Sequence, residues 1–174
     1  MKKLFLLSAI AGVFAFSSVK AQTRDVAMSG PKLGIGAEFA FPMGDFGDVM
    51  DFGYGASLSY LHPIASGLSV TANAGYISFK SKEVFGQTYN MGTIPVKAGL
   101  RYYPAQNFYI GGELGAAFST EDNVGTSFAY SPGIGIEFPV ADKGAVELGA
   151  RYEAWSNDGT AGFLGLRLAY NFGL

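Results

Sequence analysis

The strongest constraint on the fold is an alternation of apolar and polar residues with a period of two. It is clearest in AVELGARYEA, residues 145–154, where Leu148 and Tyr152 lie on one face and Glu147 and Arg151 lie on the other. This period is typical of a β-strand with two unlike faces. The pattern suits a soluble barrel with its charges outside and equally a membrane barrel with its charges inside, so the rest of the chain must decide between them.

Eight stretches of the chain keep this period of two, and no long stretch keeps the 3.6-residue period of an amphipathic helix. They predict strands at 32–41, 52–61, 68–79, 92–103, 108–119, 128–140, 145–155 and 162–172. The second, fourth and sixth connections are short, whereas the others are longer and more polar. We therefore expect an all-β fold, an eight-stranded antiparallel up-and-down barrel with turns at one end and loops at the other.

The two faces of these strands differ sharply in composition. One face carries large apolar residues and no charge, and the other carries mainly glycine and small polar residues with a few charges. An eight-stranded barrel has an interior that side chains just fill, so the large apolar face cannot be the inside. A soluble exterior would also carry about 25% or more charged residues. The apolar face is therefore predicted to contact lipid, which makes the barrel a transmembrane one.

The charged residues of the small polar face are predicted to lie in the lumen. An unpaired charge in a narrow space of low dielectric is costly, so these side chains should form ion pairs. A tight turn in which Tyr103 faces Asn107 would place Lys97 opposite Glu113. The predicted lumen charge network consists of Glu38, Lys97, Arg101, Glu113, Glu137, Glu147, Arg151, Glu153 and Arg167.

Aromatic residues on the apolar face gather toward the ends of the predicted strands, as expected of the two girdles at the membrane interfaces. The loop-side girdle is predicted to contain Phe39, Tyr54, Tyr76, Phe118, Tyr130, Tyr152 and Phe163, the last of which breaks the parity of its strand. The turn-side girdle is predicted to contain Tyr60, Tyr102, Phe108, Phe138, Tyr170 and Phe172.

The first 21 residues combine Lys2 and Lys3 with an apolar run and a small-residue exit at Ala21. This is the pattern of a signal peptide cleaved after Ala21, and the run is shorter than the roughly 20 residues of a membrane-spanning helix. A short leader at 22–31 and the barrel domain at 32–174 would follow. Loss of three lysines leaves nine basic and fourteen acidic residues in the mature chain, which argues against nucleic acid as a partner. The chain has no cysteine and so no disulfides.

The segments FPMGDF, GLRYYP and LGLRLAYNF resemble those of the small OmpA/OmpX-like outer-membrane β-barrel proteins of Gram-negative bacteria. The resemblance covers the whole mature chain and implies location in the bacterial outer membrane. It also implies that the alternating residues Leu168, Tyr170 and Phe172 are recognised by the barrel assembly machinery, although Gly173 and Leu174 follow the usual terminal aromatic residue. Outer-membrane lipid is then a partner, and the exposed loops are the expected place for an extracellular ligand.

Two groups of residues suggest chemistry, and each has a simpler interpretation. His62, the only histidine, lies in HPIASG and is expected to be a solvated residue near a turn, although some barrels that act on lipid use a histidine. Asp45, Asp48 and Asp51, with Glu121 and Asp122, lack the spacing of a calcium loop and are expected to be solvated. We therefore expect no catalytic, cofactor or metal site and a structural or surface-interaction role. The alternatives are an outer-membrane enzyme acting on lipid, a small-solute channel and a soluble lipocalin-like barrel.

Overall fold

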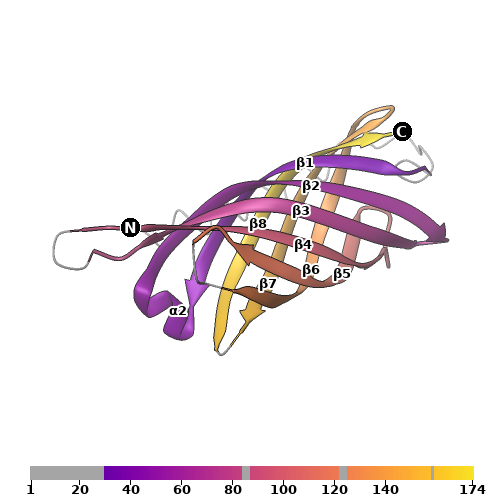
Figure 1. The fold of residues 1–174 in the computed structure, drawn as a ribbon. Helices are drawn as coiled ribbons and strands as arrows, with labels where there is room; N and C mark the ends of the chain where they lie inside the picture. The colour runs from indigo at the N-terminus through magenta and orange to yellow at the C-terminus, as the bar shows by residue number, and fades with distance from the viewer. Residues whose placement is uncertain (1–29, 84–86, 122–124, 158) are drawn as a thin grey trace.

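The chain folds into a closed β-barrel, shown as a ribbon in Figure 1. The computed structural model describes residues 30–83, 87–121, 125–157 and 159–174. The predicted signal peptide and most of the predicted leader lie outside these residues. The strands are β1 (Lys32–Met43), β2 (Met50–Ala65), β3 (Leu68–Ser81), β4 (Asn90–Tyr102), β5 (Phe108–Ser119), β6 (Thr126–Ala141), β7 (Gly144–Ser156) and β8 (Thr160–Gly173).

Each strand pairs antiparallel with its neighbours in the sequence, and β1 pairs with β8 to close the sheet. This confirms the predicted eight-stranded, antiparallel, up-and-down barrel. Closure leaves no unpaired sheet edge, so the strands satisfy their backbone hydrogen-bonding groups within the sheet. No helix among the described residues is long and apolar enough to cross a membrane.

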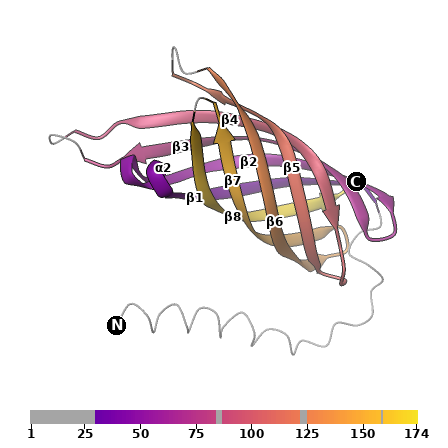
Figure 2. The ribbon, with the colours of Figure 1, turned by 90° about the horizontal axis from the view of Figure 1, so that it is seen from below.

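The two ends of the barrel differ in their connections (Figures 1 and 2). At what we call the turn end, residues 66–67, 103–107 and 142–143 join the strands. Gly67, with φ of 71°, adopts the left-handed conformation that such a short turn requires. At the loop end the connections are 44–49, 82–89, 120–125 and 157–159.

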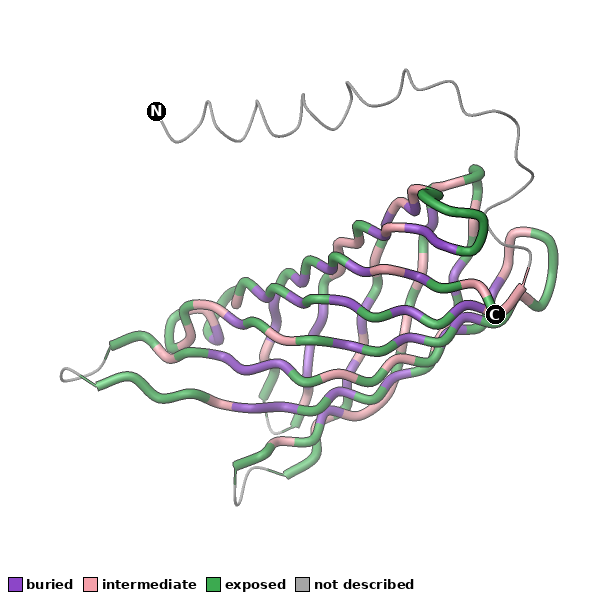
Figure 3. Tube along the Cα trace, turned by 90° about the horizontal axis from the view of Figure 1, so that it is seen from above, coloured by how far each residue is buried: buried purple, intermediate pink, exposed green. Residues whose placement is uncertain are grey.

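Burial alternates along the strands, as the purple and green bands of Figure 3 show. In β1 the residues Lys32 and Glu38 are buried, whereas Ile35 and Phe39 are 52% and 40% exposed. The exposed set is apolar and the buried set includes the charges, which is the reverse of a soluble protein. The predicted assignment of the two faces therefore matches the burial of these side chains.

The loop PMGDFGDVMD contains a short helix, α2 (Gly44–Val49), that the sequence pattern did not predict. The helix begins at Gly44, whose φ of 58° turns the chain out of β1. Phe46 is the buried residue of α2, and it points back into the loop end of the barrel. The acidic residues Asp45 and Asp48 remain exposed.

The predicted register of β4 and β5 is wrong. Lys97 pairs with Gly115 and Glu113 pairs with Gly99, two residues away from the predicted alignment. The connection is wider than the predicted tight turn, because the ladder pair nearest to it is Tyr102 with Ile110. The Tyr103 N–H donates to the Gly67 carbonyl at 2.7 Å. The carbonyl of Asn107 likewise accepts from the Glu137 N–H at 2.8 Å. Tyr103 and Asn107 are thus bonded to other hairpins and not to each other.

Candidate functional site: the charged lumen and the loop-end mouth

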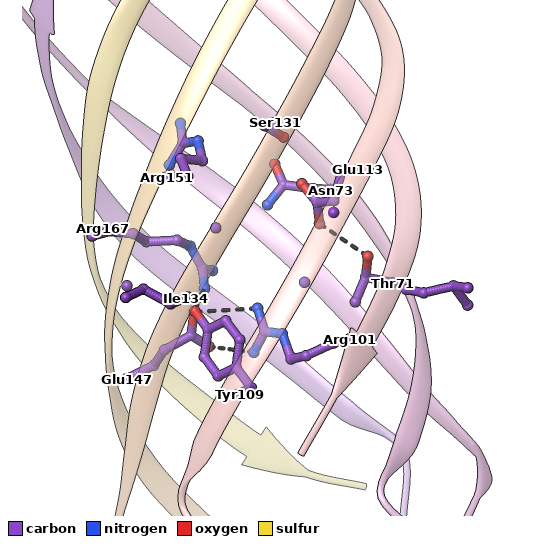
Figure 4. A pocket seen from close by; sticks show the side chains of 16 residues that line it. Thr71, Asn73, Arg101, Tyr109, Glu113, Ser131, Ile134, Glu147, Arg151 and Arg167 are labelled. Carbon is purple, nitrogen blue, oxygen red and sulfur yellow. Dashed lines mark hydrogen bonds and ion pairs between the residues drawn. The ribbon is translucent and has the colours of Figure 1, made fainter. Parts of the chain in front are cut away.

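The side chains of the predicted network all lie inside the barrel. Each of them forms an ion pair with at least one other charged side chain of the lumen. Figure 4 shows how several of them converge on the barrel axis from strands on opposite sides. Most are buried, and Glu137, Glu147 and Glu153 are fully so. The lumen is therefore filled by a connected set of charges.

Glu147 is the centre of the half of the network nearer the turn end. Its carboxylate accepts from Arg101 Nη1 and Arg167 Nη1, both at 2.9 Å. The Tyr109 hydroxyl and the Asn171 amide also donate to it, each at 2.8 Å. These four donors come from three strands, β4, β5 and β8, so one carboxylate of β7 ties opposite walls of the barrel together.

Arg101 connects this centre to the turn end of the lumen. Its Nη1 lies 3.0 Å from Glu137 Oε1, and its guanidinium lies over the Tyr109 ring at 3.8 Å from the ring centre. Such a position adds a cation–π contact to the ion pairs. Tyr103 in the turn donates to Glu137 at 2.8 Å, and burial raises the pKa of its phenol above the ordinary value. The Tyr103 phenol therefore stays a protonated donor to a higher pH than an ordinary tyrosine.

Glu153 is the centre of the half nearer the loop end. It accepts from Lys97 Nζ and from Arg151 Nε, both at 2.6 Å. Arg151 also reaches Glu38 at 2.7 Å, which joins β7 to β1 across the lumen. Lys97 lies 3.7 Å from Glu113, so this pair forms a long contact despite the wrong register prediction.

Lys32 is a member of the network that the sequence analysis missed. Its Nζ lies 2.6 Å from Glu137 Oε2, and the residue is only 6% exposed. With Lys32 these ion pairs of the lumen join five acids to five bases, where the prediction had five to four. The signal was present, because Lys32 shares the parity of Gly34, Gly36 and Glu38 on its strand.

Replacement of Lys32 by Met should lower the free energy of unfolding by about 1 to 3 kcal/mol, because Glu137 Oε2 loses its ion-pair partner. Glu137 keeps Arg101 and Tyr103 on its other oxygen, which limits the loss. Denaturant titration of the protein in lipid vesicles measures the change. A Lys32→Met variant as stable as the parent would show that this end of the network contributes nothing.

The predicted girdle residues lie mostly on the outer surface. Nine of the thirteen are exposed and three are half-buried. Phe163 is different: it is fully buried inside the barrel, so its assignment to the loop-side girdle is wrong. Its odd number gives it the same parity as Gly165 and Arg167, which face the lumen. The break in alternation at Phe163 therefore indicates correctly that this side chain faces the lumen and not the lipid.

Phe163 belongs to a cluster that closes the lumen beneath the loops, which we call the aromatic plug: Phe46, Phe79, Trp155 and Phe163. The centre of the Phe79 ring lies 5.6 Å from that of Trp155 and 5.3 Å from that of Phe163, and both pairs are edge-on. Such geometry is favourable for aromatic pairs. Phe46 of α2 completes the aromatic plug, with its ring centre 5.1 Å from that of Phe79. The Trp155 Nε1–H donates to Glu153 at 2.8 Å, so the plug rests directly on the charge network.

Between the plug and the turn end the lumen keeps little free space. A cavity of about 50 Å³ lies beside the charges, lined by Thr71, Arg101, Tyr109 and Glu113 among others. This volume holds a few water molecules. It does not form a water-filled channel of the size found in porins.

The residues weighed as catalytic or metal-binding do not form such a site in the described part of the chain. His62 lies in β2 near the turn end and is exposed, with Nδ1 3.1 Å from the Tyr60 hydroxyl. No group of three or more histidine or acidic residues that could hold a metal ion is found among the described residues. Asp122 lies outside them.

Comparisons with known proteins agree with this architecture. The chain matches the family described as outer membrane protein beta-barrel domain over residues 7–172, and it belongs to that family. It is thus an outer-membrane β-barrel, and the soluble lipocalin-like alternative is excluded. A comparison with curated protein sequences returns no significant match.

Three solved structures illustrate the shared fold. Neisserial surface protein A is 17% identical, with a TM-score of 0.61 over 84% of this chain and 98% of that one. Ail, the attachment invasion locus protein of Yersinia pestis, is 19% identical, with a TM-score of 0.58 over 83% and 100%. OprG from Pseudomonas aeruginosa is 13% identical, with a TM-score of 0.57 over 84% and 97%.

Proposed function

We propose that this protein is an integral outer-membrane barrel with a structural or surface-interaction role, which it performs through loops outside the cell. The difference between the two barrel ends supports this orientation, because outer-membrane barrels have short turns in the periplasm and longer loops outside. Its resemblance in fold to a neisserial surface protein and to an attachment protein supports the surface role.

The filled lumen is the observation that carries the proposal. Ion pairs cross the barrel and the aromatic plug closes it beneath the loops. A barrel of this kind is not a general porin, since open aqueous channels need about 16 strands. Solute traffic or chemistry would therefore have to displace a network whose members are paired, and the exposed loops are left as the working surface.

An enzymatic role is not part of the proposal. The lumen carboxylates are engaged in ion pairs that join the walls of the barrel, which supports a structural part for them. His62 lies at the turn end, away from the loops, and contacts Tyr60. No cofactor is invoked.

Assembly is proposed to use the last strand. Leu168 and Phe172 are exposed on the outer face of β8, and Tyr170 lies between them with its ring 4.6 Å from that of Phe172. An alternating apolar strand end of this kind fits recognition by the barrel assembly machinery, which we propose as a partner together with outer-membrane lipid.

The hairpin of β3 and β4 is the best candidate for the contact surface. It projects past α2 at the loop end in Figure 2. Its described end carries exposed residues of both charges, Lys80, Lys82 and Glu83, and Tyr89 is 64% exposed. Tyrosine is enriched at protein-recognition surfaces, and polar residues form their rim.

Shortening the connection 82–89 to a two-residue turn tests the proposal. We expect cells that display the shortened barrel to lose binding to an immobilised panel of glycans and matrix proteins that the parent binds. The matched control replaces Ala105 and Gln106 at the turn end, which should leave binding unchanged because these residues face the periplasm. Both proteins must reach the surface in equal amount. Equal binding after loss of the hairpin end would show that this hairpin is not the contact surface, and a parent that binds nothing on the panel would leave only a structural role.

A further inference from the structure

We propose that the loop-end mouth of the barrel is a binding pocket for a small, uncharged and largely apolar molecule that carries a hydroxyl or similar polar group. The pocket lies above the aromatic plug and has a volume of about 360 Å³. Small-molecule sites in proteins begin at about this size. This inference goes beyond the surface role, because it concerns a concave site inside the mouth and not the projecting hairpin.

The floor of the pocket is apolar. It is formed by Phe46 of α2, Trp155 of β7 and Met91 of β4, with Ala117 and Ala161 beside them. The plug beneath fixes this floor, since Trp155 packs edge-on against Phe79 and Phe163 and donates to Glu153. A ligand would thus meet a rigid apolar surface and could not pass further into the lumen.

The wall of the pocket is polar but carries almost no charge. Thr93, Ser119, Ser127 and Thr160 contribute hydroxyl groups from four different strands, and Asn157 adds an amide. An apolar floor with a few convergent hydrogen-bonding groups is the usual composition of a site that binds and orients a small molecule. Such groups can bond a hydroxyl or carbonyl of the ligand.

The charge around the pocket selects against anions. Asp45 is the charged residue of the lining, and Glu153 lies directly under the floor, bonded to Trp155. The described lining contains no lysine or arginine. The charge of Glu153 is already paired with Lys97 and Arg151. A carboxylate or sulfate in the pocket would therefore lose its hydration without gaining a cation in the described lining, and it would be repelled by Asp45, whereas a neutral molecule would not.

Trp155 makes the proposal directly testable, because it is the only tryptophan of the chain and forms part of the pocket floor. The protein is folded in lipid nanodiscs, and its fluorescence is titrated with trichloroethanol and with trichloroacetate. Both quench tryptophan on contact and are close in size, but only the second is charged at neutral pH. We expect saturable quenching by trichloroethanol in the millimolar range and at least roughly tenfold weaker quenching by trichloroacetate. Cyclohexanol, which does not quench, should restore the emission by competition.

A Ser127→Leu variant fills the pocket from β6 and should abolish the saturable quenching. The control is Ser66→Leu, the same change in an exposed turn at the opposite end of the barrel. A mobility shift on heating before electrophoresis shows that both variants are folded barrels. Linear quenching that is the same in the parent and in Ser127→Leu would mean simple partitioning into lipid and would overturn the proposal. Equal quenching by trichloroacetate would also overturn it, because the pocket would then not select neutral molecules.

Discussion

Replacement of Glu147 by Gln should lower the free energy of unfolding by about 3 to 5 kcal/mol, the cost expected when one partner of a buried ion pair is removed. Glu147 is fully buried and is contacted by two guanidinium groups, from Arg101 and Arg167. The amide keeps the shape of the side chain but removes its charge, and its NH₂ group faces donors. Both arginines would then remain in the lumen with less compensation.

Glu113→Gln is the matched control for this experiment. Glu113 lies 3.7 Å from Lys97 and its side chain is 16% exposed, so its ion pair is longer and better hydrated. Its neutralisation should cost about 1 kcal/mol, the order of a single intramolecular hydrogen bond, because Lys97 keeps its ion pair with Glu153. Reversible denaturant titrations in vesicles compare the two variants with the parent. Equal losses would contradict the central place of Glu147 in the network.

Leu148→Arg should destabilise the barrel by about 2 to 4 kcal/mol, the cost of a basic residue on the lipid face near the middle of the membrane. Leu148 is 40% exposed and pairs with Leu168 and Ile136, which lie between the two aromatic girdles. Its side chain has no contact with the lumen charges. The loss of stability in Leu148→Arg therefore measures the cost of placing a charge against lipid. Refolding into vesicles determines this loss.

Val140→Arg is the control for depth. Val140 is 58% exposed one residue before the end of β6, so an arginine there can reach the aqueous interface and should cost roughly 0 to 1 kcal/mol. Gly149, next to Leu148, does not serve as a neutral control. A Cβ at that position would lie 2.7 Å from the Tyr109 hydroxyl, which donates to Glu147. Equal costs at Leu148 and Val140 would contradict a lipid-facing belt.

The strands and their faces could be predicted because one physical requirement governs every strand of such a barrel. Each must present an apolar face to lipid and a small polar face to the lumen, so residues such as Leu148 and Glu147 are assigned by parity alone. Lys32 was missed only because it stands at the first position of its strand, where a charge resembles part of a leader. Its parity with Glu38 carried the information.

Other features depend on contacts between distant parts of the chain. The pairing of Arg151 with Glu38 joins residues 113 positions apart, and the closed geometry of the barrel decides it. The predicted register of β4 and β5 is wrong because their connection is wider than a tight turn, and the ladder pair nearest to it is Tyr102 with Ile110. The sequence analysis assumes that the lumen face carries only small or polar residues. Near the loop end, beyond the membrane, that face also carries large apolar residues such as Phe163, so the aromatic plug is not predicted.

Single-channel recording of the purified protein in a planar lipid bilayer tests the filled lumen most directly. The ion pairs around Glu147 and Glu153, with the aromatic plug above them, should block ion flow through the monomer. We expect insertion into the bilayer without a steady current above the baseline. A steady, large conductance from the monomeric barrel would contradict the account, because it would require a continuous aqueous path through the network.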